Sequence, residues 1–303
     1  MSKMQPAPTR MSFALSSEIV NGTHYIDLFQ CASIINRRFY RQGLNWAVSG
    51  FTFISGTNAG ATVSIEKIQT SWTTSGSWEK TMRHWLKQQN EAIEEAGTES
   101  VTARFRDYKI HMDDQHVANG FAANLLPWSS AVPFVPGEWE ASQIVIPNDG
   151  APGVTNEYFV KLYGASDATS KGIIEGYALS RSVPQTPDPS TIGSSDQSWI
   201  SEMINVGDSE DSVLVNAQYN NRNLPYSQLL YPGAVGNGGS GELVDSLIFT
   251  NTTLSAKQSA RGSEFPCGLI KLNLGGFTQN MTIFVDLVPG MNRGYLTQDM
   301  KDM

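Results

Sequence analysis

Residues 44–69 read LNWAVSGFTFISGTNAGATVSIEKIQ, and this stretch decides the fold class. Apolar and polar side chains alternate on both sides of a glycine-bounded turn at residues 56–60, and such alternation gives a strand one apolar face. The apolar positions are Trp46, Val48, Phe51, Phe53, Val63, Ile65 and Ile68. The stretch therefore predicts strands around Ser49-Gly50 and a further strand at 61–69, joined as a β-hairpin.

Outside this stretch, strand-like segments dominate the chain, and each is bounded by Gly, Pro, Asn or Asp. They are residues 18–29, 101–112, 141–146, 157–163, 172–180, 212–219, 243–250, 268–274 and 281–288. Strands do not alternate with helices, which argues against a parallel α/β sheet. The predicted fold class is all-β.

One amphipathic helix stands out at residues 77–96. Ser77 is a suitable N-cap, and Trp78, Met82 and Trp85 recur at helical spacing. Because the flanking segments favour strands, we expect this helix to be an insertion between strands.

The charge of the chain is low and uneven. Charged residues make up 17% of the chain and the net charge is −8, whereas a free-standing nucleic-acid binder is usually basic. Residues 117–255 hold 14 acidic and 4 basic residues. We expect the region around Asp208, Glu210 and Asp211 to form an outward or inter-subunit face.

The ends of the chain and its linkers are predicted from composition. Residues 1–17 are expected to form a flexible arm, residues 181–198 a linker, and residues 290–303 a short polar tail. Residues 1–10 lack the apolar segment of a signal peptide, and no apolar run reaches the length of a membrane helix. We therefore expect the protein to be made and kept in the cytosol.

No motif predicts catalysis, a metal or a cofactor. Residues 236–241 (GNGGSG) match a dinucleotide motif formally, but a Pro-Gly turn precedes them and a strand follows, so a surface loop is expected. The group His111, Asp113, Asp114 and His116 fits no zinc or calcium spacing, and a solvated strand end is expected there. Cys31 and Cys267 form no metal or redox spacing, so two buried free thiols are expected.

Arg37, Arg38 and Arg41, interleaved with Phe39 and Tyr40, form a small basic and aromatic patch. It is a candidate contact for nucleic-acid phosphate or lipid headgroups. The alternative is a segment held by local ion pairs. Three arginines supply too little charge to condense a genome, so any binding to DNA is expected to be weak and salt-sensitive.

Two segments carry a resemblance to a known family. Residues 35–53 (INRRFYRQGLNWAVSGFTF) and 283–296 (IFVDLVPGMNRGYL) resemble segments of capsid proteins from small tailless viruses. The nearest group is the double jelly-roll major capsid proteins, including those of lipid-containing single-stranded DNA bacteriophages. The two segments cover about a tenth of the chain.

The resemblance implies two tandem jelly-roll barrels, which we expect at residues 18–182 and 183–303. Three copies of such a chain make a pseudo-hexagonal capsomer. About eleven strands are predicted where two barrels need sixteen, so a single jelly-roll with large insertions is the alternative.

The implied function is that of a non-enzymatic major capsid protein that self-assembles in the host cytoplasm into an icosahedral virion. Its expected partners are further copies of itself in a homotrimer and shell, other virion proteins such as a penton or spike, and an internal membrane or the genome. A carbohydrate-binding β-sandwich, such as a phage receptor-binding protein or a glycosidase, is the alternative, since seven Trp and ten Tyr suit sugar-binding platforms. Oligomeric state and glycan binding separate the two.

Overall fold

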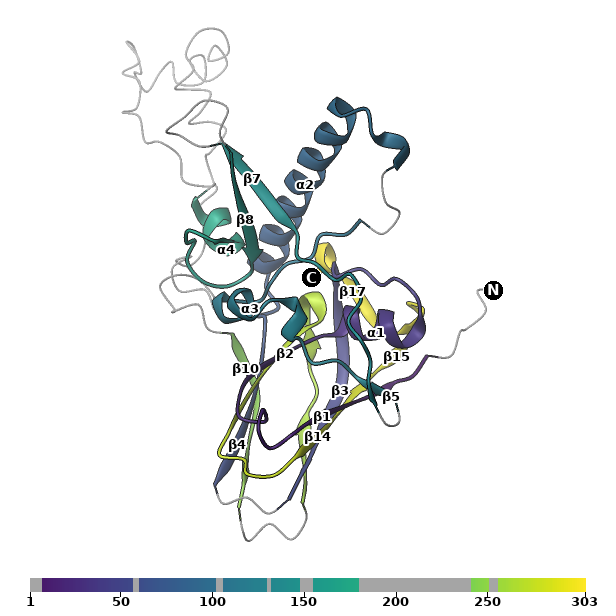
Figure 1. Ribbon diagram of the computed structural model, residues 1–303, viewed down its shortest axis with the longest axis vertical. Coiled ribbons are helices and arrows are strands. Elements are labelled where there is room, and N and C mark those ends of the chain that lie inside the picture. Colours follow the sequence, from purple (N-terminus) through teal and green to yellow (C-terminus); the bar gives the residue numbers. More distant parts are fainter. Residues whose placement is uncertain are drawn as a thin grey trace, which may run out of the picture.

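The computed structural model describes residues 7–56, 60–101, 106–129, 132–147, 155–179, 241–250 and 256–303. Eight strands form two antiparallel sheets that face each other as a sandwich (Figure 1). The first sheet has the order β1 (Arg10–Leu15), β14 (Met281–Leu287), β3 (Leu44–Ser55), β11 (Lys257–Arg261). The second has the order β10 (Glu242–Phe249), β4 (Ala61–Lys67), β13 (Leu269–Gly275), β2 (Gly22–Asp27). The expected β-rich, antiparallel class is confirmed.

The strands pair in a nested order. β1 pairs with β14, β2 with β13, β3 with β11, and β4 with β10. The first four strands of the sandwich therefore meet the last four in reverse order, as if the whole chain were one long hairpin. Two further pairings join the central strands of the sheets, β14 with β3 in the first sheet and β13 with β4 in the second. The predicted division into residues 18–182 and 183–303 departs from this pairing, because strands from both ranges share both sheets.

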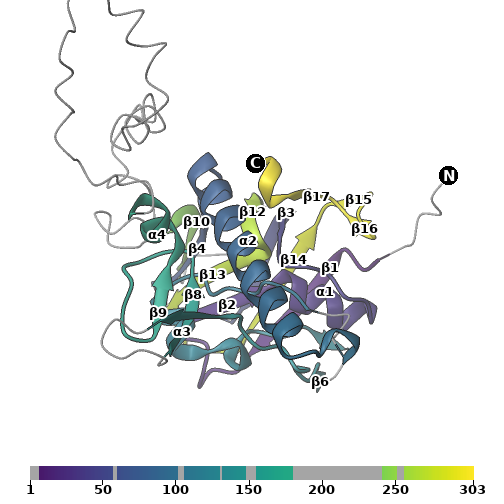
Figure 2. The ribbon, with the colours of Figure 1, turned by 90° about the horizontal axis from the view of Figure 1, so that it is seen from above.

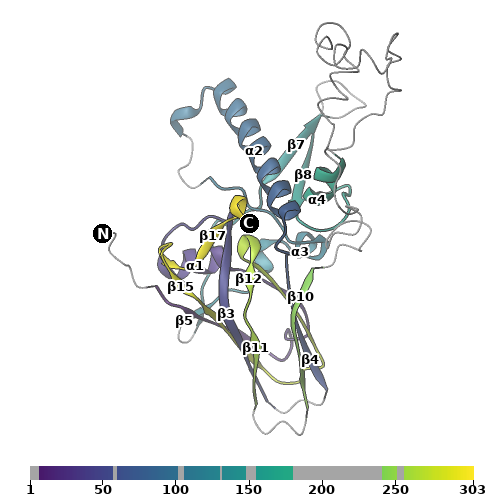
Figure 3. The same cartoon turned by 180° about the vertical axis from the view of Figure 1, so that it is seen from behind.

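The two sheets face each other (Figure 3). They enclose one apolar core, to which both sheets contribute side chains. Phe13, Phe53 and Ile283 point inward from the first sheet, and Val63 and Leu272 from the second, each at most 1% exposed. Burial alternates along β1, β4 and β14 as the period of a strand requires. Cys31 and Cys267 are buried and free, as expected.

The predicted hairpin at residues 44–69 is wrong in its pairing, although its strands are present. β3 runs through Ser49-Gly50 as one continuous strand, and β3 and β4 belong to opposite sheets. Alternation along a strand shows only that one of its faces is buried. Two strands paired in a hairpin and two strands on opposite sheets of a sandwich both have this pattern, so the pattern does not identify the partner strand.

The predicted N-terminal arm and the predicted C-terminal tail both contribute to the folded domain. β1 lies within the expected N-terminal arm, and its Met11, Phe13 and Leu15 are buried, while residues 1–6 lie outside the described part. The expected polar tail continues as short strands, and Tyr295 and Met300 are fully buried. Its strands are β15 (Pro289–Gly290), β16 (Gly294–Tyr295) and β17 (Thr297–Asp299), and the last of these pairs with β3, as β12 (Glu264–Phe265) does.

A long insertion separates β4 from β10. Most of its described elements lie at one end of the sandwich (Figures 1 and 2), while β5 lies beside β1. Its described elements are α2 (Trp72–Glu95), the 3-10 turn Glu99–Val101, α3 (Asp114–Asn119), the 3-10 turn Phe121–Ala123, β5 (Trp128–Ser129), β6 (Val132–Pro133), β7 (Gln143–Pro147), β8 (Thr155–Lys161), β9 (Ser170–Gly172) and α4 (Ile173–Leu179). β7, β8 and β9 form a separate small sheet. The strands expected at 141–146 and 157–163 are confirmed as β7 and β8.

Two other predicted strands of the insertion are wrong. Most of residues 172–180 form α4. In the range 101–112 the structure describes residue 101 and residues 106–112, and of these only His111 makes a β-bridge, to Lys161. Both segments are short apolar runs, for which periodicity does not separate strand from helix or buried coil. The strand expected at 212–219 and the linker at 181–198 lie outside the described residues.

The predicted helix is confirmed as α2, but it begins earlier than expected. Ser71 is the N-cap and its hydroxyl accepts the Thr74 N–H, whereas Ser77 lies buried inside the helix. Trp78 and Trp85 bury their rings in a second apolar cluster between α2 and the end of the sandwich. The helix thereby attaches the insertion to the β-domain.

Helix α1 (Leu28–Asn36) was not predicted. Asp27 caps it by accepting the N–H groups of Phe29 and Gln30. The residues from Leu28 to Ala32 are all buried, so this short helix lacks the polar face that would distinguish it from a strand in sequence. Arg37 follows as the C-cap of this helix.

Candidate functional site

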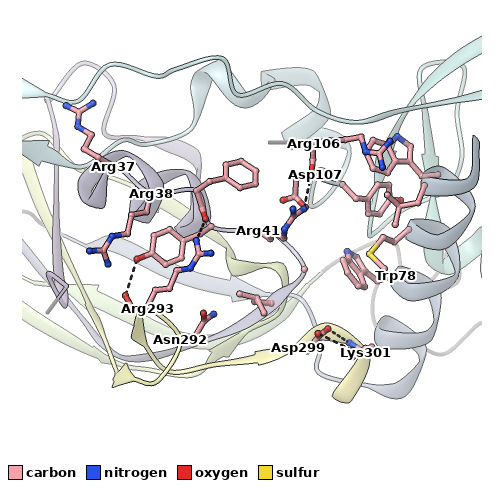
Figure 4. Close-up of a pocket in the computed structure, with 18 residues that line it drawn as sticks. Arg37, Arg38, Arg41, Trp78, Arg106, Asp107, Asn292, Arg293, Asp299 and Lys301 are labelled. Atoms are coloured by element: carbon pink, nitrogen blue, oxygen red, sulfur yellow. Dashed lines mark hydrogen bonds and ion pairs between the residues drawn. The ribbon is translucent and has the colours of Figure 1, made fainter. Parts of the chain in front are cut away.

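A cleft of about 890 Å³ lies where the sandwich meets the insertion. Its walls come from the loop after α1, residues 78–86 of α2, the segment 106–108, the turn between β15 and β16, and residues 299–301 near the C-terminus. Arg37, Arg38 and Arg41 all line it, so the predicted basic patch is one wall of a cavity rather than an isolated surface (Figure 4).

The loop that carries these arginines is fixed by Ser33 and Gln42. The Ser33 carbonyl accepts the Arg38 N–H at 3.2 Å, and its hydroxyl accepts the Tyr40 N–H at 3.0 Å. The buried Gln42 amide donates to the Ile110 carbonyl at 3.0 Å and accepts the Ile110 N–H at 2.6 Å. Buried hydrogen bonds therefore join the arginine loop to the segment at Ile110, 68 residues away in sequence.

Positive charge exceeds negative charge in the cleft. Six cationic residues line it, namely Arg37, Arg38, Arg41, Arg106, Arg293 and Lys301, against two acidic ones, Asp107 and Asp299. Arg41 pairs with Asp107 at 3.4 Å and Lys301 with Asp299 at 3.5 Å. Among the described residues the remaining four guanidinium groups have no carboxylate within ion-pair distance. The local ion-pair alternative therefore accounts for Arg41 only.

Asp107 is the structural carboxylate of the cleft. Burial raises its pKa, and the Gln42 N–H, which donates at 2.8 Å, and the Arg41 charge act in the opposite direction. Its Oδ1 faces Arg41 while its Oδ2 faces the Gln42 backbone. We infer that Asp107 is committed to holding the loop in place.

Aromatic rings form the opposite part of the lining. Trp78, Trp85 and Tyr108 pack together on the α2 side, with Trp78 and Tyr108 rings 6.3 Å apart and Trp85 and Tyr108 rings 5.5 Å apart. Gly43 makes room for Trp78, since a Cβ at residue 43 would lie 2.6 Å from the indole ring. Figure 4 shows Trp78 and Arg106 towards one end of the cleft and Arg38 and Arg293 towards the other.

Sequence reasoning missed Arg106, Arg293 and Lys301. Arg293 donates to the Phe39 carbonyl and its guanidinium carbon lies 5.9 Å from the Tyr40 ring centroid, 253 residues away in sequence. No local pattern joins such distant residues. One signal was present, because residues 35–53 and 283–296, the two segments quoted for the resemblance, meet at this cleft.

The group His111, Asp113, Asp114 and His116 is not the solvated strand end that was expected. His111 and His116 are at most 2% exposed, and Asp113 caps α3 while accepting hydrogen bonds from Tyr25 at 2.6 Å and Lys271 at 2.8 Å. Only Asp114 is exposed. The group is a buried polar link between the insertion and strands β2 and β13.

The pKa values of this link follow from burial and hydrogen bonding. Burial lowers the pKa of His116 to about 3 and that of His111 to about 4. Burial alone would raise the pKa of Asp113, but the hydrogen bonds from Lys271 and Tyr25 outweigh it and hold that pKa below its usual value. Within the described residues, no three His, Cys, Asp or Glu side chains converge as metal ligands.

Two other predicted features lie outside the described residues, namely the glycine-rich residues 236–240 and the acidic group Asp208, Glu210 and Asp211. In the part of the chain that the structure describes, no helix has the length and apolar character to cross a bilayer. Comparison with models of known families, with curated proteins and with solved structures found no match to this chain.

Proposed function

We propose that this chain is a structural subunit of an icosahedral virus shell, the major capsid protein, built on a single jelly-roll with a large insertion. The observation that carries the proposal is the nested strand pairing of the sandwich. A jelly-roll has eight strands in two sheets, as if one long hairpin had been rolled up. In such an arrangement each strand of the first half of the chain pairs with its counterpart from the second half. Viral capsid domains are a major class of jelly-roll proteins, beside lectins and cupins.

The position of the insertion supports a role in assembly. It leaves the sandwich between β4 and β10, which are adjacent strands, and most of its described elements lie at one end of the β-domain (Figure 1). Loops and insertions at the end of a rigid sandwich are free to contact neighbours without disturbing the core. Copies of one chain contact each other through such repeated surfaces in a closed shell.

Exposed apolar residues on β10 support self-association. Leu243 and Ile248 are 57% and 60% exposed on an edge strand of the second sheet. Exposed apolar side chains on a sheet edge favour contact with another chain. Further exposed apolar residues of the insertion are Trp72, Trp128, Val132 and Val135.

The expected pseudo-hexagonal trimer needs two barrels in each chain. The described residues form one sandwich, so a trimer of this chain would present three sandwiches. We keep a homotrimer as the expected building unit, in a virion shell with penton or spike proteins as partners. No catalytic role forms part of the proposal.

The test is the oligomeric state of the purified full chain. Light scattering after a sizing column and negative-stain images should reveal trimers or shells that grow with protein concentration. The variant Leu243→Lys with Ile248→Lys should shift this distribution towards the monomer, because both side chains lie outside the core. Ile19→Lys, which charges an exposed residue elsewhere, is the matched control.

A wild-type protein that stays monomeric at all concentrations tested would contradict the proposal. Glycan binding by such a monomer would favour the carbohydrate-binding alternative. Glycan-array binding is therefore measured on the same preparation.

A further inference from the structure

We propose that the basic cleft binds single-stranded nucleic acid, with phosphates on its arginines and a base against its aromatic lining. This inference goes beyond shell formation and does not rest on it, because binding is measured on the unassembled chain.

The excess of positive charge in the cleft favours a ligand with several negative charges. The guanidinium groups of Arg37, Arg38, Arg106 and Arg293 share one cavity, and the described residues offer them no carboxylate. The chain as a whole carries a net charge of −8, so this local excess is not a general property of its surface. The planar fork of arginine matches the oxygens of a phosphate group.

Unused hydrogen-bond donors point to the same conclusion. Nη1 of Arg38 and Nη1 of Arg106 are buried and find no acceptor among the described residues, and neither does Nε1 of Trp78, a side chain that is 3% exposed. Buried donors in folded proteins are normally paired. Three unpaired donors around one cavity are explained by a ligand rich in acceptor oxygens.

The backbone is strained where it presents two of the arginines. Arg37 and Arg293 have φ of 53° and 49°, and they are two of only three non-glycine residues with positive φ in the described chain. Left-handed conformations of ordinary residues are costly and gather at functional sites. Figure 4 shows both residues in the part of the cleft away from Trp78, with the Arg37 side chain pointing away from Arg293.

Size and aromatic content favour a single strand over a duplex or a lipid surface. The volume of about 890 Å³ falls within the usual range of enclosed ligand sites, roughly 300–1,000 Å³. Among the aromatic side chains that line the cleft, Trp78, Trp85 and Tyr108 are at most 6% exposed. Phe39 is only partly buried and offers a ring on which an unpaired base can stack. A bilayer or a duplex meets a broad outer surface, whereas these cations lie inside a concavity.

The experiment is fluorescence anisotropy of a labelled twelve-nucleotide oligothymidine with the purified full chain. We expect a Kd of roughly 10⁻⁴–10⁻⁶ M at physiological salt, typical of sequence-independent binding. Replacing both arginines in Arg106→Gln with Arg293→Gln should weaken binding at least ~10-fold at low salt. The slope of log K against log salt should fall by about 1.4, at about 0.7 for each phosphate contact.

The matched control is Arg83→Gln with Lys87→Gln, which removes the same charge from the exposed surface of α2 and should change Kd less than about twofold if long-range charge effects are screened. Circular dichroism and thermal unfolding check that each variant folds. Arg38→Gln alone provides a second test if the double variant does not fold. An equal loss of affinity in the control and cleft variants would overturn the proposal.

Two further arms identify the ligand. An abasic phosphodiester strand of the same length should bind more weakly than oligothymidine, because it has no base to stack on Phe39. Equal binding of both strands would overturn the assignment to nucleic acid in favour of a general polyanion site. Vesicles with anionic lipid should not compete with oligothymidine, and competition that is lost in the cleft variant would assign the cleft to a membrane instead.

Discussion

At the scale of single residues, His116 illustrates how burial and hydrogen bonding fix one protonation state. Its Nδ1 accepts the Met112 N–H at 3.1 Å, so its Nε2 carries the proton and donates to Asn124 at 2.9 Å. The ring stacks on Tyr25 with centroids 4.3 Å apart. A second proton would sit on Nδ1 and face the Met112 N–H, which is why the neutral form is the one compatible with the fold.

We predict that the free energy of unfolding decreases as the pH falls below about 6.5. The pKa of His116 is about 3 in the folded chain, so at pH 4.5 the unfolded chain binds a proton on this residue that the folded chain does not. Stability from this residue is therefore fully present above pH 6.5 and is lost progressively towards pH 3. The loss at pH 4.5 is about 2 to 3 kcal/mol at 1.36 kcal/mol per pKa unit.

Urea unfolding at pH 7 and pH 4.5 measures this loss. His116→Gln retains an acceptor and a donor but does not titrate, so its loss between the two pH values should be smaller by about 2 kcal/mol. His111, whose ring centroid is 5.0 Å from that of His116, and Asp113 titrate in both proteins and cancel in the comparison. Equal losses in wild type and variant would show that His116 is protonated in the folded state.

At the scale of elements, β1 has the clearest energetic role. It is an edge strand that pairs with β14. Its Phe13 lies opposite Ile283 in this pairing and is 1% exposed. We predict that Phe13→Ala lowers the free energy of unfolding by about 3–5 kcal/mol, because it removes a ring from the core and leaves a cavity. Ile19→Ala, at a 56% exposed position just after β1, should cost less than about 0.5 kcal/mol. Denaturant titration of both variants checks the contrast, and similar costs would place β1 outside the cooperative unit.

Which elements could be predicted from sequence depends on whether the local pattern carries the information. β3, β4, β13 and β14 each bury alternate residues, so their alternation was visible. α1 was not visible, because residues from Leu28 to Ala32 are buried all round. The pairing of β3 was not predictable either, since its partners β14 and β11 lie more than 200 residues away.

For the candidate site too, the sequence predicted the local grouping of residues but not the contacts between distant segments. Arg37, Arg38 and Arg41 stand together in sequence and appear together in the cleft. Arg106 and Arg293 enter it only because Gln42 binds Ile110 and because the turn between β15 and β16 packs on Tyr40. The sequence thus indicated the chemistry of the cleft, while its full charge follows from tertiary contacts.

At the scale of the whole molecule, the nested pairing makes the two halves of the chain inseparable. Residues 241–303 supply β10, β11, β13 and β14, and each of these pairs with a strand from residues 10–67. The insertion adds a second attachment, because Asp113 is bonded both to Tyr25 of β2 and to Lys271 of β13. Neither half holds a complete core by itself.

We therefore predict that cutting the chain once between residues 181 and 240 leaves one folded particle. A specific protease site placed in this range would give two fragments, which denaturing gels would separate. On a native sizing column the fragments should elute together, and they should come apart only in denaturant, because their separation would expose both faces of the Phe53, Val63 and Leu272 core. Two tandem barrels divided at residues 182 and 183 would instead yield two fragments that elute apart and each unfold cooperatively. Co-elution with a single unfolding transition would establish that one sandwich, closed by both ends of the chain, is the unit of folding.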